Sequence, residues 1–339
     1  MPALSESIIH SSRGPSPMRP GYSSTASYRP DGLSVADEVH PVIHAGRVAV
    51  ITGAASGIGK AAAIELAKIG LKIAMADVDE ARLAPAAKEV GAIANVDGAT
   101  NVIFVPTDVS QIDQVVRLKE RVYETWGEVA VLINNAGVAP KGTSWSGIDN
   151  WRKAFDVNVF GIVNVQQTFI PFMLHQENPS VIINTGSKQG ITNPPGNAAY
   201  NASKAAVKSL TEGLSHELRE FPGSHVTAHL FVPGWTHTGM TGANPPTSPN
   251  AEEPPEVPKP EGAWSATETV LYMLDKVRSG DFYIICPDNE TRREVDQLRC
   301  GSCGAPPTSQ RADPRSAAGT GTTSTCTRST SRTDWPVFL

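Results

Sequence analysis

The sequence is poor in several features that mark particular classes of protein. It has 4 cysteines in 339 residues, too few for a disulfide scaffold. No apolar run approaches the ~20 residues of a membrane helix, and the N-terminus lacks the basic flank and apolar core of a signal peptide. Lys and Arg number 29 against 34 Asp and Glu, so the net charge of −5 argues against a nucleic-acid groove. We therefore expect a cytoplasmic protein that binds no membrane and no nucleic acid.

The two ends of the chain show no apolar periodicity. Residues 1–42 hold nine Ser and six Pro and cannot bury enough surface to offset their ordering entropy, so we predict a disordered leader. Residues 300–339 hold fourteen Ser or Thr, and we predict that this tail is disordered too. Cys300 and Cys303 form one CxxC pair with no second pair at zinc spacing, so no metal site is expected.

Between residues 43 and 299, short apolar runs alternate with helix-length segments. The runs are nearly continuous in Val, Ile and Ala, as expected for strands covered on both faces. Regular alternation predicts one α/β domain: a doubly wound Rossmann domain with a seven-stranded parallel sheet and helices on both faces. The predicted strands are Val48–Thr52, Lys72–Ala76, Val102–Pro106, Val129–Ile133, Val181–Asn184, Val226–Phe231 and Phe282–Ile285. The predicted helices are Gly59–Ile69, Glu80–Val90, Ile112–Trp126, Trp151–Leu174, Tyr200–Glu220, Ser265–Arg278 and a polar helix over Thr291–Arg299.

A proline-rich segment, residues 241–264, follows the sixth predicted strand. Its seven Pro exclude regular helix. Loops beyond the carboxyl ends of the strands border the ligand crevice in this architecture. We therefore interpret the segment as a substrate lid, and a variable surface insertion is the alternative.

The first predicted strand leads into a glycine-rich turn and then a helix. In the segment Thr52-Gly-Ala-Ala-Ser-Gly-Ile-Gly59, glycine permits a tight turn and close approach of the backbone to a phosphate. The helix N-terminus then offers free N–H groups to a pyrophosphate. Asp77 ends the second strand, where a carboxylate binds the adenosine ribose hydroxyls and repels a 2′-phosphate. NAD is therefore favoured over NADP, although an ordinary Asp that starts a turn fits the same place.

With these motifs the chain resembles the classical short-chain dehydrogenase/reductase family over roughly residues 44–299. The glycine spacing TGxxxGIG is that family's, and four further segments follow in the family's order. They are Asn134-Asn135-Ala136-Gly137; Asn158; Ser187 with Tyr200-Asn-Ala-Ser-Lys204; and Pro233-Gly234 with Thr236 and Thr238.

The resemblance implies hydride transfer between a nicotinamide cofactor and an alcohol or carbonyl carbon. Tyr200 would be the acid/base, Lys204 would lower the tyrosine pKa and hold the nicotinamide ribose, and Ser187 would bond the reacting oxygen. Tyr200 and Lys204 are four residues apart and so share one helix face. Asn158 would position a water on the proton path behind Lys204; alternatively, backbone groups satisfy its side chain.

The resemblance also implies a cofactor-binding set, with a simpler alternative for several members. Asp108 would bind the adenine amino group or cap the next helix, a role for which Ser110 competes. Asn135 would contact ribose or lock the strand end. Thr236 and Thr238 would bond the carboxamide or are ordinary loop hydroxyls. The full set is Gly53, Ser56, Gly57, Ile58, Gly59, Asp77, Asp108, Asn135, Tyr200, Lys204, Thr236 and Thr238; Lys188, Gln189 and Trp235 face either substrate or the packed interior.

The sequence thus predicts an NAD-dependent oxidoreductase acting on a small-molecule secondary alcohol or ketone. The alternative is a catalytically silent scaffold that keeps the cofactor fold. The resemblance implies a homodimer or homotetramer. Because hydrophobic patterning stops abruptly after Arg299, our hypothesis for residues 300–339 is a shifted reading frame or a mispredicted splice site. With suitable codons, a second frame of Ala312–Thr320 resembles the endings of other members of the family.

Overall fold

A computed structural model describes residues 40–94, 101–241, 258–287 and 295–296. The predicted lid lies largely outside these residues, as do the predicted leader up to residue 39 and the predicted tail. None of the helices in the described residues combines the length and the hydropathy of a membrane-spanning segment.

The central element is one parallel sheet of seven strands. Its order is β3-β2-β1-β4-β5-β6-β9, and every neighbouring pair is parallel. The chain starts at β1 in the middle, builds outward to β3, then crosses over to β4, so the order reverses between β1 and β4. Such a switch point opens a crevice at the carboxyl ends of the strands. The strands are β1 (Val48–Thr52), β2 (Lys72–Asp77), β3 (Val102–Pro106), β4 (Val131–Asn134), β5 (Ser180–Thr185), β6 (Val226–Val232) and β9 (Tyr283–Ile285).

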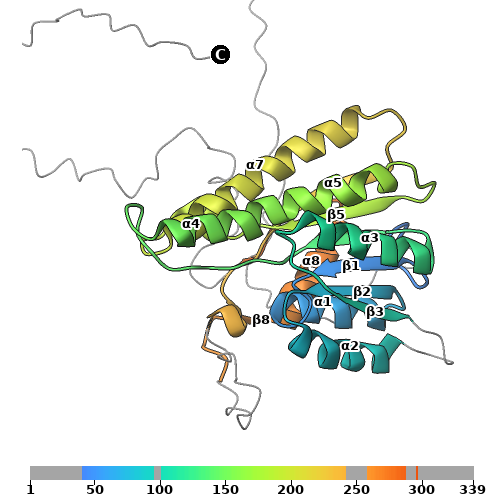
Figure 1. Cartoon of the computed structure of the whole chain (residues 1–339), viewed down its shortest axis with the longest axis horizontal. Coiled ribbons are helices and arrows are strands. Elements are labelled where there is room, and N and C mark those ends of the chain that lie inside the picture. The colour runs from blue at the N-terminus through green and yellow to red at the C-terminus, as the bar shows by residue number, and fades with distance from the viewer. Residues whose placement is uncertain (1–39, 95–100, 242–257, 288–294, 297–339) are drawn as a thin grey trace, which may run out of the picture. The chain divides into compact units, whose positions relative to one another are not determined.

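Helices cover both faces of the sheet and divide the core into two layers (Figure 1). Because successive strand residues point to opposite faces, Ala49 and Ile51 of β1 join one buried cluster while Val48 and Val50 join the other. The first cluster is completed by α1 (Gly57–Lys68), α2 (Glu80–Ala94) and α8 (Ala266–Arg278). The second is completed by α3 (Ile112–Trp126), α5 (Gly161–Met173) and α7 (Ala198–Glu220). The predicted doubly wound Rossmann architecture is confirmed.

The predicted single helix over Trp151–Leu174 is wrong in detail. The structure has α4 (Ile148–Phe155), a π-helical turn η1 (Asp156–Phe160) and then α5. The turn inserts where the side chain of Asn158 bonds the backbone of Val138 in both directions. Sequence periodicity gives no sign of this turn, and the bonding partner of Asn158 lies 20 positions away in the chain.

Several elements are too short to be predicted from periodicity. They are α6 (Gln189–Thr192), the 3₁₀ turn η2 (Gly239–Thr241) and a two-stranded sheet of β7 (Thr236–His237) and β8 (Trp264–Ser265). β8 joins the end of the predicted lid segment to β7, and Ser265 then starts α8 with a capping box to Glu268.

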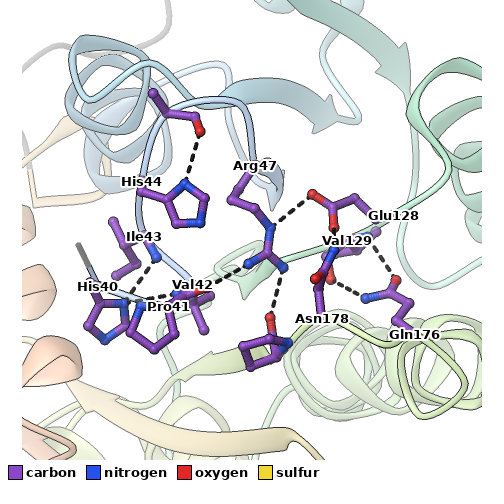
Figure 2. A network of polar contacts seen from close by, with 12 residues as sticks. His40, Pro41, Val42, Ile43, His44, Arg47, Glu128, Val129, Gln176 and Asn178 are labelled. Atoms are coloured by element: carbon purple, nitrogen blue, oxygen red, sulfur yellow. Dashed lines mark hydrogen bonds and ion pairs between the residues drawn. The ribbon is translucent and has the colours of Figure 1, made fainter. Parts of the chain in front are cut away.

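Packing also begins earlier than the predicted end of the leader at residue 42. Val42 is buried in the first cluster, and the ring of His40 accepts hydrogen bonds from the backbone N–H groups of Val42 and Ile43. Arg47 bonds Glu128 and the carbonyls of Pro41 and Pro179, which ties this segment to the sheet (Figure 2).

Candidate active site

A cleft of about 510 Å³ lies at the carboxyl ends of the strands, across the switch point between β1 and β4. Most of the residues predicted to bind the cofactor or to act in catalysis line it. They are Gly53, Ser56, Gly57, Ile58, Asp77, Asp108, Asn135, Tyr200, Lys204 and Thr238. Gly59, Asn158, Ser187 and Thr236 are not among its lining residues.

The glycine turn has the conformation that its sequence predicts. Gly53 and Gly57 have φ of 66° and 52°, which side chains rarely adopt. Gly59 is not at the cleft wall, but a Cβ there would lie 2.1 Å from the carbonyl oxygen of Gly53. Gly59 therefore keeps α1 packed close under the turn. No acidic side chain sits in the first turn of α1, and the hydroxyl of its N-cap Ser56 makes no capping bond, so the N–H groups of this helix end suit an anionic phosphate.

Asn135 connects the end of β4 to this turn. Its Nδ2 donates to the carbonyls of Thr52 and Gly53, at 3.1 and 3.2 Å. Its backbone N–H and that of Ala136 both donate to the hydroxyl of Thr52. These contacts fit the alternative of locking the strand ends, and the residue also lines the cleft.

Asp77 holds its carboxylate at the cleft by two backbone hydrogen bonds. Oδ2 accepts from the N–H of Ala55 in the glycine turn, and Oδ1 accepts from the N–H of Asp79, both at 3.0 Å. Asp77 therefore starts a turn, as the alternative proposed, and still lines the cleft. Arg82, which the sequence did not single out, lines the same region, where its Nε donates to Asp79 at 2.6 Å. An arginine on α2 has no motif to mark it; only the fold brings it to the cleft.

Asp108 does not cap the next helix. Its Oδ1 accepts from the N–H and the hydroxyl of Ser110, at 2.9 and 2.8 Å, which closes a turn after β3. The N-cap of α3 is Gln111, which makes no side-chain capping bond, so neither Asp108 nor Ser110 has that role. Asp108 lines the cleft.

Tyr200 and Lys204 project from the first turns of α7 into the cleft. The Nζ of Lys204 donates to the carbonyl of Thr185 at the end of β5, at 2.7 Å, and lies 5.8 Å from the centre of the Tyr200 ring. Burial lowers the pKa of Lys204 to about 8. Burial raises the pKa of Tyr200, and a hydrogen bond with the Ser187 side chain lowers it in part. Ser187 is thus in contact with the phenol although it is outside the cleft lining.

Asn158 is fully buried in the π-helical turn. Its Nδ2 donates to Val138 O and to the hydroxyl of Ser203, both at 2.9 Å, and its Oδ1 accepts from Val138 N at 2.8 Å. These contacts fit the alternative in which backbone satisfies the side chain. Gly137 lies between Asn158 and Lys204: a Cβ on it would be 3.2 Å from Asn158 Oδ1 and 3.6 Å from Lys204 Nζ.

The two threonines after β6 have different surroundings. Thr236 is buried, and its hydroxyl lies 3.2 Å from that of Thr269 and 3.4 Å from Gly234 O. Thr238 lines the cleft beside Gly57. The structure brings only Thr238 to the cleft.

Lys188, Gln189 and Trp235, which the sequence assigned to either substrate contact or packing, do not line the cleft. Lys188 forms an ion pair with Asp296 at 2.9 Å; the Asp296 side chain is buried and that of Lys188 is 11% exposed. Gln189 accepts a hydrogen bond from Asn197, and Trp235 is 46% exposed. In the part of the chain that the structure describes, no cluster of His, Cys, Asp or Glu could hold a metal ion.

Comparisons with known proteins agree with this geometry. A family model described as short chain dehydrogenase matches residues 47–248. An uncharacterized oxidoreductase of Staphylococcus aureus is 34% identical over 230 residues, which are 67% of this chain and 90% of that protein. A 3-oxoacyl-[acyl-carrier-protein] reductase of Thermotoga maritima is 36% identical over 58% of this chain and 76% of its own length. The crystal structure of a short chain dehydrogenase/reductase from Burkholderia phymatum in complex with NAD superposes with a TM-score of 0.63 at 38% identity, covering 72% of this chain and 89% of that one.

Proposed function

Because the chain belongs to the short-chain dehydrogenase family, we propose that it transfers a hydride between NAD(H) and a secondary alcohol or ketone. The observation that carries the proposal is that Tyr200 and Lys204 line a cleft built on the glycine turn, with the Ser187 side chain bonded to Tyr200. Nicotinamide supplies the hydride chemistry when bound; the side chains of this protein orient the reactants and move the proton.

The cleft fits a dinucleotide by its donors and its shape. Gly53 and Gly57 have no side chain to block a phosphate, and the N-terminus of α1 offers N–H groups beside them. The carboxylate of Asp77 would accept hydrogen bonds from ribose hydroxyls and would repel a 2′-phosphate, which supports NAD over NADP. The relative from Burkholderia phymatum, solved in complex with NAD, supports the same choice.

The proton would pass through the hydroxyl of Tyr200. A phenol has a pKa near ~10, and favouring the phenolate at neutral pH takes roughly 4 kcal/mol. The Lys204 ammonium lies 5.8 Å from the centre of the Tyr200 ring, and a unit charge at such a distance supplies about 3 kcal/mol at an effective dielectric constant of ~20. Burial of Tyr200 opposes ionisation, so a second positive charge is needed, and the oxidised nicotinamide ring carries one. Ser187 would bond the reacting oxygen, and Asn158 would hold the backbone beside Lys204.

Substitution of one hydroxyl tests this mechanism. Tyr200→Phe is expected to lose turnover by about 10²–10⁴-fold, because general acid–base catalysis contributes that much, while NADH binding is kept. Tyr123→Phe is the matched control, since Tyr123 bonds Gln176 and does not line the cleft. Turnover would be followed at the NADH absorbance band with a panel of secondary alcohols and ketones, and binding by NADH fluorescence. A Tyr200→Phe variant as active as the parent refutes the mechanism; a parent chain that binds NADH but converts nothing favours the silent scaffold.

We also propose a homodimer or homotetramer that pairs through the helices carrying Asn158 and Tyr200. The support is apolar surface on this side of the domain: Ile148 on α4, Phe160 in η1 and Phe172 on α5 are 61%, 55% and 45% exposed. Static light scattering of the purified chain tests it, and a monomer mass would reject it.

A further inference from the structure

A second cavity, of about 390 Å³, lies at the opposite end of the strands from the cofactor cleft. Ser180 and Val226, the first residues of β5 and β6, line it, whereas Thr185, the last residue of β5, lines the cleft. The last turns of α7 and α8 and the segment that starts at His40 complete its wall. None of the motifs assigned above reaches this cavity.

The floor of the cavity is apolar. Val42, Val181, Leu218, Val226 and Ala228 line it and are buried. Covering this apolar surface with an apolar group is favourable, because both surfaces are removed from water. The volume of 390 Å³ is within the size range of small-molecule sites.

The rim of the cavity is cationic. Arg219 and Arg278 line it together with His40 and His225, and among the described residues no Asp or Glu does. Within the same described residues Arg278 has no ion-pair partner. The pKa of His40 is lowered by burial first and then by the charges of Arg278, His44 and His229. At His229, burial lowers the pKa, and the backbone hydrogen bond to Asp281 and the charge of its carboxylate raise it in part.

Two further groups offer donors at the wall. The Nδ1 of His40 accepts from the N–H groups of Val42 and Ile43, so the neutral ring carries its proton on Nε2 (Figure 2). The hydroxyl of Ser180 is buried and has no hydrogen-bond partner among the described residues, which costs free energy unless a ligand or water completes it. By contrast His229 has both ring nitrogens bonded, to Thr227 and to the carbonyl of Asp281.

We propose that this cavity binds a small amphipathic anion, namely a carboxylate that carries a short alkyl chain. The carboxylate would lie among Arg219, Arg278, the Nε2–H of His40 and the hydroxyl of Ser180, and the chain would cover the apolar floor. A small inorganic anion would leave that floor exposed, and a neutral alcohol would bring no negative charge to the two arginines. The proposal does not depend on the reaction catalysed at the other end of the sheet.

Calorimetric titration of the full chain with octanoate tests the proposal, beside octan-1-ol, acetate and octyl phosphate. We expect octanoate to bind at least roughly tenfold more tightly than octan-1-ol, which lacks the charge, and than acetate, which lacks the chain. Arg278→Gln should weaken octanoate binding by roughly threefold to fivefold, as for an exposed ion pair, and the double variant with Arg219→Gln should weaken it further. Arg121→Gln on α3 is the matched control, because Arg121 is exposed and does not line the cavity.

Each other outcome overturns a stated part of the proposal. Equal binding of octanoate and octan-1-ol overturns recognition of the anion. Tighter binding of octyl phosphate than of octanoate overturns the carboxylate as the preferred group. Unchanged octanoate binding in the double arginine variant, with melting curves like the parent's, places the ligand elsewhere and overturns the site.

Discussion

Lys204 is a buried ammonium whose pKa is lowered to about 8 by burial alone. Between about pH 8 and 10.4 the unfolded chain holds this proton while the folded chain without cofactor has released it. The free energy of unfolding therefore rises with pH in this window, by about 3 kcal/mol in total. Below about pH 8 both states are protonated and the contribution is flat.

Denaturant unfolding of the parent and of Lys204→Met between pH 7 and 10 checks this expectation. The buried Tyr200 has a raised pKa and opposes the trend only above about pH 10, which lies beyond this range. The difference in free energy of unfolding between parent and variant should grow in favour of the parent above about pH 8. Parallel pH profiles would show that Lys204 titrates normally and would weaken its assigned role at Tyr200.

Asp77→Asn removes the charge of this residue and keeps one of its two hydrogen bonds. The amide oxygen can still accept from Ala55 or Asp79, the amide nitrogen cannot accept from the other, and the repulsion of a 2′-phosphate is removed. We expect kcat/KM with NADP(H) to rise relative to NAD(H). Steady-state rates with both cofactors measure the ratio, and a parent protein that prefers NADP(H) contradicts the assignment of Asp77.

Residue positions at the cleft were predictable where a motif ties them to a strand end or to the start of a helix. Gly53 and Asp77 follow from their places at strand ends, because the carboxyl ends of parallel strands meet at one edge. Tyr200 and Lys204 share a helix face by their spacing, and the family resemblance assigned them to the site. Contacts between distant residues were not predictable. The hydrogen bonds of Asn158 to Val138 and the approach of Arg82 to the cleft depend on the fold as a whole.

At the scale of elements, the strands were predictable because they are buried on both faces and so are almost entirely apolar. β1, β4 and β5 have no exposed residue. The short elements α6, β7 and β8 were not, since none is long enough to show a period. They are held by contacts to their neighbours, as β8 is by its pairing with β7.

The junction of β1 and α1 gives a prediction with an internal control. Gly59→Ala would place a Cβ 2.1 Å from the carbonyl of Gly53, so the turn must shift, and we expect a loss of about 1–3 kcal/mol in stability together with weaker NADH binding. Gly213→Ala in α7 has no atom within 4 Å of the new Cβ and should be stabilising by about 0.5–1 kcal/mol. Urea unfolding and NADH titration compare the two; equal effects would show that Gly59 is not packed as described.

At the scale of the whole molecule, the sheet order follows from the alternation of strands and helices together with the family resemblance. The first and last residues of the domain are harder to predict from the sequence. Val42 is packed although it lies in a stretch rich in Ser and Pro, because burial of one side chain in the core is invisible to local composition. Among the residues that the structure describes after β9, Asp296 forms an ion pair with Lys188, the residue that follows Ser187.

We expect Asp296 to contribute to the stability of the domain and residues 300–339 to contribute nothing. Asp296 is 0% exposed and lies 2.9 Å from Lys188, which follows Ser187 directly. Removing the carboxylate leaves the Lys188 ammonium with less compensation for its charge. We therefore expect Asp296→Ala to cost about 1–3 kcal/mol and to lower the melting temperature by several degrees.

Deletion of residues 300–339 should leave the melting temperature unchanged, because the composition of this tail supplies no core. Calorimetry of the parent, the deletion and the point variant decides the matter; a deletion as destabilising as Asp296→Ala would show that the tail is part of the fold and would end the frame-shift hypothesis.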